Sequence, residues 1–115
     1  MRFLVLMTEA DHFEHWDAAS EAEQQAVFDS FRAFDAAVAA AGGEIVGGEA
    51  LTRPGEARTL RPGSARVVTE GPYAETVEQL GGFYLVELPH LDAAVEVARL
   101  LPSAYTIEVR PVQPT

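Results

Sequence analysis

Two short segments of the chain are apolar on both of their faces, and they restrict how the chain can fold. Alternate residues of a strand point to opposite sides of a sheet, yet residues 2–7 and 82–88 carry apolar side chains at both sets of positions. The sets are Phe3, Val5 and Met7 against Leu4 and Leu6 in the first segment, and Phe83 and Leu85 against Tyr84, Val86 and Leu88 in the second. Because strands of this kind are covered on both sides, we expect both segments to be buried strands.

Two helices are indicated by capping signals and apolar spacing. Ser20 and Glu23 have the spacing of a capping box, which satisfies free amides at a helix start, and Gly42-Gly43 suits a helix end. The first helix carries a stripe at three- and four-residue spacing, formed by Val27, Phe31, Phe34, Val38 and Ala41. The second begins at His90 or Leu91, stops at Pro102, and presents Leu91, Ala94, Val95, Ala98 and Leu101.

The remaining segments are shorter. Residues 44–51 and 105–112 are predicted strands, and the last of these alternates apolar with charged positions. Residues 57–61 and 65–69 flank Pro62-Gly63-Ser64, which predicts a small hairpin. Residues 8–19 are polar, and we expect them to be irregular.

The predicted order is strand, helix, strand, hairpin, strand, helix, strand. Two split β-α-β units of this kind form a ferredoxin-like α+β sheet, βαββαβ, here with an extra β-hairpin before the third principal strand. The first and third principal strands are central in that arrangement, and they are the two segments that are apolar on both faces. With 115 residues, the chain is expected to be a single domain, residues 1–115.

Two helices can cover only one face of such a sheet. The other face then exposes either Leu4 and Leu6 or Phe3, Val5 and Met7, together with the matching residues of the third principal strand. Leaving these side chains in water forgoes roughly 1.5–3 kcal/mol each and creates a large apolar patch. We therefore expect a homodimer packed sheet to sheet, with any ligand pocket near the shared interior.

Composition narrows the classes of function. The net charge of −10 argues against a nucleic-acid groove, which needs surplus positive charge. The chain has no cysteine, which removes disulfides, thiolate catalysis and thiolate metal sites and is compatible with a reducing cytosol. No apolar run reaches membrane-spanning length. We expect a cytoplasmic protein that binds neither nucleic acid nor membrane.

Half of the basic residues fall in one short window. Arg53, Arg58, Arg61 and Arg66 share residues 53–66 with a single acid, Glu56, so the window carries +3 and the rest of the chain −13. The simple interpretation is a solvated, turn-rich hairpin. The alternative is a basic patch that contacts an acidic partner or an anionic ligand.

The segment 69–87, TEGPYAETVEQLGGFYLVE, joins a Gly-Pro turn, an acidic stretch and a Gly-Gly pair to the third principal strand. EGPYAETVEQLGGFYLVEL resembles the DGPF-type signature of the YCII-related domain family, in which Asp-Gly-Pro-Phe precedes an acidic segment and Gly-Gly-Phe/Tyr. The flanking stretches MRFLVLM, GGEIVGGEAL, LDAAVEVARLLP and IEVRPV resemble the family too, so the resemblance covers nearly the whole chain.

This resemblance implies a dimeric α+β barrel. The DGPF-type branch looks like a companion of extracytoplasmic-function sigma factors, which implies a regulatory role. Another branch carries a His and an Asp taken as a catalytic pair, and relatives in the wider superfamily isomerise or dehalogenate small ring compounds. Here the motif Asp is Glu70 and the motif Phe is Tyr73, and residues 20–41 contain no histidine.

The Glu70-Gly71-Pro72-Tyr73 corner is one candidate site. Gly71 precedes a proline and must be extended or in a conformation that only glycine tolerates. In the functional interpretation, Glu70 is a pocket carboxylate, as a base or a ligand acceptor, and Tyr73 forms a pocket wall. In the structural interpretation, Glu70 accepts backbone amides and holds the corner.

His12 and His15 are the second candidates, as general bases at the mouth of the pocket. Their three-residue spacing also suits two metal ligands on one helical turn, with Asp11 or Glu14 adding oxygen. The sequence shows no third strong ligand, so we predict no metal, and exposed loop histidines are the simplest interpretation.

Tyr84 and Arg110 are ligand-binding candidates that project from strands into the expected dimer interior. Glu108 or Glu49 would be their carboxylate neighbours, although a surface ion pair between Glu108 and Arg110 explains that pair as well. No phosphate loop, dinucleotide motif or G-x-S-x-G is present, so we expect no cofactor.

Two functional hypotheses follow. The first is a small dimeric ligand-binding or accessory domain, associated with a sigma-factor system. The second is an enzyme that uses acid–base chemistry on small, cyclic organic molecules.

Overall fold

A computed structural model describes residues 1–115. Its elements in chain order are β1 (Arg2–Ala10), α1 (His12–Ala18), α2 (Glu21–Ala40), β2 (Glu44–Ala50), a 3-10 turn (Pro54–Glu56), β3 (Arg58–Leu60), β4 (Val68–Glu70), β5 (Glu78–Glu87), α3 (Leu91–Ala98) and β6 (Thr106–Pro111). None of the helices combines the length and the apolar character needed to cross a membrane.

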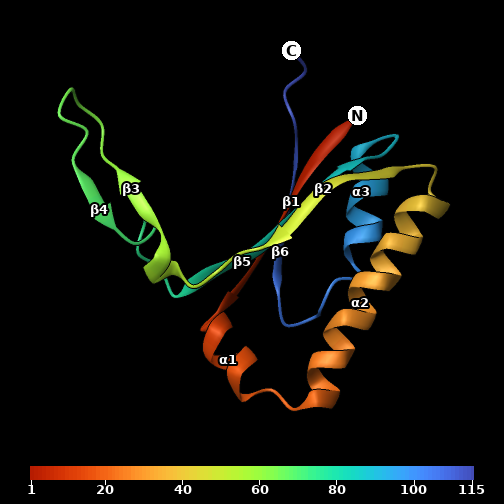
Figure 1. The fold of residues 1–115 in the computed structure, drawn as a ribbon. Coiled ribbons are helices and arrows are strands. Elements are labelled where there is room, and N and C mark those ends of the chain that lie inside the picture. Colours follow the sequence, from red (N-terminus) through yellow and green to blue (C-terminus); the bar gives the residue numbers. More distant parts are fainter.

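The main sheet has four strands in the order β2-β5-β1-β6, and every neighbouring pair is antiparallel. Its two central strands are β1 and β5, which confirms the prediction for the first and third principal strands. This α+β order is compatible with a ferredoxin-like arrangement. The predicted hairpin is also confirmed, because β3 and β4 form a separate two-stranded sheet that stands away from the body of the molecule (Figure 1).

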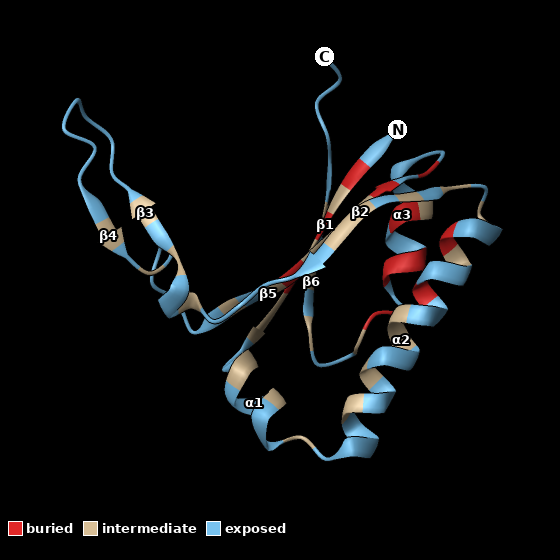
Figure 2. Cartoon of the chain, viewed as in Figure 1, coloured by how far each residue is buried: buried red, intermediate tan, exposed pale blue.

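The core lies between one face of the main sheet and the helices α2 and α3, which pack on the same side (Figure 1). Its fully buried members come from β1, α2, β5, α3 and the segments that follow β5 and α3, and the largest are Phe3, Phe34, Leu88, Val5, Val38 and Val86. In Figure 2 the buried parts of α2 lie in its C-terminal half, beside α3.

The opposite face of the sheet has no helix over it. Leu4 pairs with Leu85 and Leu6 pairs with Phe83 across β1 and β5, so these four half-buried side chains share that face. The structure thus assigns Leu4 and Leu6, rather than Phe3, Val5 and Met7, to the uncovered side. The molecule is a slab of 48 × 43 × 17 Å, with a radius of gyration of 15.8 Å against roughly 13 Å for a compact chain of this length.

The predicted helix signals are present. The Ser20 hydroxyl accepts a hydrogen bond from the Glu23 amide at 3.1 Å, and the Glu23 carboxylate accepts one from the Ser20 amide at 3.2 Å. Gly42 ends α2 with a φ of 78°, a conformation that glycine adopts readily. At the second helix, His90 is the N-cap, because its Nδ1 accepts a hydrogen bond from the Ala93 amide.

The expectation of an irregular segment over residues 8–19 was wrong. β1 continues to Ala10, opposite an early part of β5, and the pairing passes through an irregularity between Met7 and Thr8. Asp11 then turns the chain with a φ of 53°, and α1 follows. A hydrogen bond joins the start of α1 to the first residues of β5, since the Phe13 amide donates to the Gln79 side-chain oxygen at 3.2 Å.

Candidate functional site

A cleft opens where the N-terminal half of α2 diverges from the sheet. It has two compartments, of about 480 Å³ and about 300 Å³, lined from α1, α2, the strands and the segment before β6. The compartments adjoin, because His12, Trp16, Val27 and Tyr105 line both of them. The cleft is on the helix-covered side of the sheet, whereas the pocket expected in the interior shared by two subunits stays a prediction.

The larger compartment is mostly apolar and has a wall of aromatic rings. The rings of Trp16 and Phe28 meet edge to face with centroids 5.7 Å apart, and those of Phe31 and Tyr84 meet in the same way at 6.4 Å. Phe28 also contacts Phe31 at 6.5 Å, so the rings form a continuous series from α1 across α2 to β5. Such a surface suits an apolar or aromatic molecule.

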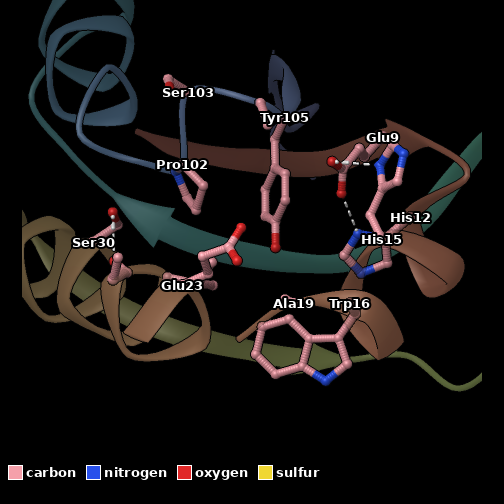
Figure 3. Close-up of a pocket in the computed structure, with 13 residues that line it drawn as sticks. Glu9, His12, His15, Trp16, Ala19, Glu23, Ser30, Pro102, Ser103 and Tyr105 are labelled. Atoms are coloured by element: carbon pink, nitrogen blue, oxygen red, sulfur yellow. Dashed lines mark hydrogen bonds and ion pairs between the residues drawn. The ribbon is translucent and has the colours of Figure 1, made fainter. Parts of the chain in front are cut away.

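The smaller compartment is the more polar of the two, and its main feature is one carboxylate shared by two histidines (Figure 3). The Glu9 oxygens contact the Nδ1 atoms of His12 and His15 at 2.9 Å and 3.1 Å. The side chains of Glu9 and His12 are each only 14% exposed, whereas His15 is 60% exposed. Glu9 and His12 therefore form a sheltered pair at the junction of the two compartments.

The Glu9–His12 contact determines what His12 can do chemically. A carboxylate only accepts hydrogen bonds, so in neutral His12 the proton lies on Nδ1 and Nε2 keeps a free lone pair. This is the arrangement of an oriented general base, held by a hydrogen bond on its far nitrogen.

Gly81 makes room for the His12 ring. A Cβ added at Gly81 would lie 2.5 Å from His12 Nε2, which no ordinary contact allows. The ring is further held by edge contacts to Phe13 and Tyr105, with centroids 4.9 Å and 5.4 Å away. The first glycine of the Gly-Gly pair is thus explained by the position of His12, whereas Gly82 packs beside Met7 and β2.

Two tyrosines of the cleft have raised pKa values. Burial raises the pKa of Tyr84 to about 12, and the negative charge of Asp35 adds to the effect. Burial also raises the pKa of Tyr105, with a further contribution from Glu9. Both phenols keep their protons at neutral pH, and Figure 3 shows Tyr105 pointing its hydroxyl end into the polar compartment, with Glu23 and Glu9 on either side.

Glu9 was not among the residues predicted from the sequence. The signal that could have identified Glu9 is the alternation of β1. Phe3, Val5 and Met7 lie on the helix-facing side of this strand, and Glu9 is the next position on the same side. A carboxylate that continues a buried apolar series, three residues before a histidine, would have indicated a site.

His12 and His15 lie together, but not as metal ligands. Both direct Nδ1 at the same carboxylate, and they lie on α1 instead of the expected loop. No group of three or more His, Cys, Asp or Glu side chains is arranged to hold a metal ion.

Glu70 and Tyr73 lie far along the chain on the β3–β4 arm, defined as residues 57–77, and line neither compartment. Their side chains are 83% and 81% exposed, and the nearest charged group to the Glu70 carboxylate is Arg58 at 4.0 Å. The corner is held by Gly71 itself. Its amide donates to the Ala57 carbonyl at 2.9 Å, and its carbonyl accepts from the Thr59 hydroxyl at 2.7 Å.

Tyr84 and Arg110 lie on opposite faces of the sheet. Tyr84 packs against Phe34 on the helix side, with ring centroids 4.7 Å apart. Arg110 pairs with Leu4 across the strands and so belongs to the uncovered face, where it contacts Glu108 at 2.6 Å. The two residues therefore do not share a site, and the Glu108–Arg110 ion pair is present.

The fold and the cleft define a small α+β domain with a pocket between its helices and one sheet face. A family model, the YCII-related domain, matches residues 1–115, and the chain belongs to this family. It is also similar to an uncharacterised protein of Rhizobium meliloti (strain 1021), with 48% identity over 61 residues. That match spans about half of each chain, 49%.

Proposed function

We propose that this protein binds a small, largely apolar molecule in the cleft between α2 and the sheet. The observation that carries the proposal is the sheltered Glu9–His12 pair at the junction of an aromatic compartment and a polar one. A ring or chain would occupy the aromatic compartment, while its polar end would face the pair. Most of the cleft wall is fixed by the sheet and by α2, so little reordering would oppose binding.

The acid–base hypothesis gains support from the same pair. His12 Nε2 would take a proton from a bound molecule while Glu9 stabilises the resulting charge, and the proton could then return to a different atom. An isomerisation needs such a shuttle and no redox partner. An enzyme acting on small cyclic molecules is therefore the second candidate.

Trp16 is the only tryptophan of the chain and lines both compartments, so its fluorescence tests binding directly. Benzyl alcohol is a suitable neutral aromatic probe, and we expect a saturable change in emission at millimolar concentration, as for a fragment of this size. The matched variants are Ala50→Phe, which fills the aromatic compartment, and Ala36→Phe, which lies on the exposed side of α2. Binding should be lost in the first only; equal behaviour of the two would contradict the proposal.

A sheet-to-sheet homodimer, as in a dimeric α+β barrel, is the second part of the proposal. The chain exposes 7597 Å² against roughly 6,100 Å² for a typical globular monomer of its mass. Four apolar side chains, Leu4, Leu6, Phe83 and Leu85, occupy the centre of the uncovered face. A second copy would remove about 800 Å² per subunit from water in an interface of standard size.

Sedimentation at micromolar concentration tests the dimer. We expect twice the 12.4 kDa chain mass, and a monomer for Leu6→Arg, which places a charge at the centre of the face. A folded wild-type monomer would overturn this part of the proposal and leave the cleft untouched.

The accessory role beside a sigma factor, the DGPF-type branch and the cytoplasmic location remain predictions. The β3–β4 arm is the surface we expect a protein partner to contact, because Leu60, Val67 and Val68 are exposed there beside several arginines. Co-purification with an extracytoplasmic-function sigma factor would support this role. If a sigma factor co-purifies with neither the wild-type protein nor the Arg61→Glu variant, that result argues against the accessory role.

A further inference from the structure

The residues that line the cleft carry acids but no permanent cation. Three acidic residues, Glu9, Glu23 and Glu49, are among them, and no lysine or arginine is. The only basic side chains are His12 and His15, and both already contact Glu9. An anionic ligand would therefore find no free positive partner and would meet carboxylates instead.

Arg53 lies beside a residue of the cleft wall but is paired with an acid outside the lining. Arg53 contacts the Asp17 carboxylate at 2.6 Å, and its guanidinium lies 5.5 Å from the centroid of the Phe13 ring. Phe13 lines the aromatic compartment, but Arg53 lines neither compartment. None of the arginines of the β3–β4 arm lines either compartment.

Two tyrosines that line the cleft each have a carboxylate close enough to affect the phenol. The pKa of Tyr84 and that of Tyr105 are raised first by burial and then by a nearby carboxylate, Asp35 and Glu9 respectively. Burial opposes any charge, but the smaller contribution of each carboxylate opposes an anion and favours a cation near it.

The aromatic wall adds a second attraction for a cation. Ring faces carry partial negative charge and attract ammonium groups within about 6 Å of the centroid. Trp16, Phe28 and Tyr105 belong to the lining, and Trp16 and Tyr105 line both compartments. An ammonium group at the junction would meet carboxylates and ring faces together.

We infer that the cleft selects a primary or quaternary amine with an apolar or aromatic body. The ammonium group would sit in the polar compartment, beside Glu9, Glu23 and the Tyr105 hydroxyl that lies between them, and the body would occupy the aromatic compartment. This inference rests on the proposed binding function and specifies its class of ligand. Anions of the same shape would bind more weakly.

Three probes of one shape and different charge test the inference: benzylamine, benzyl alcohol and benzoate, each titrated against Trp16 fluorescence in the same buffer. We expect benzylamine to bind about tenfold more tightly than benzoate, with benzyl alcohol between them. Binding of all three with benzoate equal to or tighter than benzylamine would overturn the inference alone. No binding of any probe would instead overturn the proposed binding function.

Charge variants separate the cleft from the net charge of the protein. Glu23→Gln removes a cleft charge but keeps the capping box, because glutamine serves there as well. Glu21→Gln is the matched control, since it lies in the same first turn, exposed and outside the cleft. The benzylamine preference should fall about threefold in Glu23→Gln and stay constant in Glu21→Gln. Equal effects of both variants would show that overall charge causes the preference and would overturn the inference.

Discussion

The two halves of α2 face the same sheet but meet it differently. Phe34 and Val38, in the C-terminal half, are fully buried against β1, β5 and α3. Val27 and Phe28, in the N-terminal half, line the cleft, and Phe28 is 45% exposed. One continuous apolar stripe therefore serves two purposes, because its C-terminal half packs in the core and its N-terminal half borders the cleft. Apolar periodicity shows which face of a helix turns inward, but not whether that face is packed.

The largest expected effect comes from truncating an aromatic ring at each end of α2. Phe34→Ala should lower the free energy of unfolding by about 3–5 kcal/mol, because it leaves a cavity in a closed core. Phe28→Ala should cost less than about 1 kcal/mol, because its ring already borders open space. Urea denaturation measures both, and similar losses would contradict the division of α2 into packed and cleft-lining halves.

Substitutions of two glycines compare a closely packed position with a position beside the cleft. A Cβ at Gly43 would lie 2.3 Å from the Glu87 backbone oxygen, so Gly43→Ala should cost about 1–3 kcal/mol through a forced backbone shift. Gly81→Ala instead meets the end of the His12 side chain, which can move.

We therefore expect Gly81→Ala to reduce stability by less than about 1 kcal/mol but to displace His12 and weaken probe binding at Trp16. Gly47→Ala is the control, since a Cβ there meets nothing within 4 Å. Probe binding that is unchanged in Gly81→Ala would remove the link between the Gly-Gly pair and the site.

The capping box secures the end of α2 that lacks core packing. Ser20→Ala removes the hydroxyl that accepts from the Glu23 amide, and the expected loss of stability is about 1 kcal/mol. Ser64→Ala, in the exposed hairpin turn, should have no measurable effect. Thermal unfolding followed by circular dichroism compares them, and indistinguishable midpoints would show that this helix end is held by other contacts.

A pH dependence is expected at the boundary between the two halves. The native pKa of Tyr84, about 12, lies above its ordinary value of 10.0, so the folded protein holds this proton more tightly than the unfolded chain does. The resulting stability is present below pH 10 and is lost as the pH rises toward about 12. Absorbance titration of the phenolates should show Tyr84 ionising last, and Asp35→Asn should lower its pKa. Ionisation of Tyr84 near pH 10 would contradict its burial.

Local signals in the sequence predicted most of the fold. The strands that are apolar on both faces, the capping box at Ser20 and the glycines after α2 each act within a few residues or one element, so their consequences can be read directly. The arm was also predicted, because Pro62-Gly63-Ser64 imposes its turn locally.

The site depended on contacts between distant residues. α1 is fastened by hydrogen bonds to residues more than sixty positions away, such as that between Phe13 and Gln79, and β1 extends to Glu9 only because β5 begins earlier than Gly82. Without these contacts His12 and His15 look like exposed loop residues. Glu70, in contrast, belongs to a distinctive motif whose corner is made by backbone and by Thr59, so its carboxylate is not needed for the turn.

The most direct test is to locate a bound neutral probe by nuclear magnetic resonance. Intermolecular contacts from benzyl alcohol to the ring protons of Phe28, Phe31 and Tyr84, with shifts of the His12 imidazole, are the predicted result. Contacts confined to Leu4, Leu6 and Leu85 on the uncovered face, or saturable binding with no perturbation of His12, would contradict the placement of the site between α2 and the sheet.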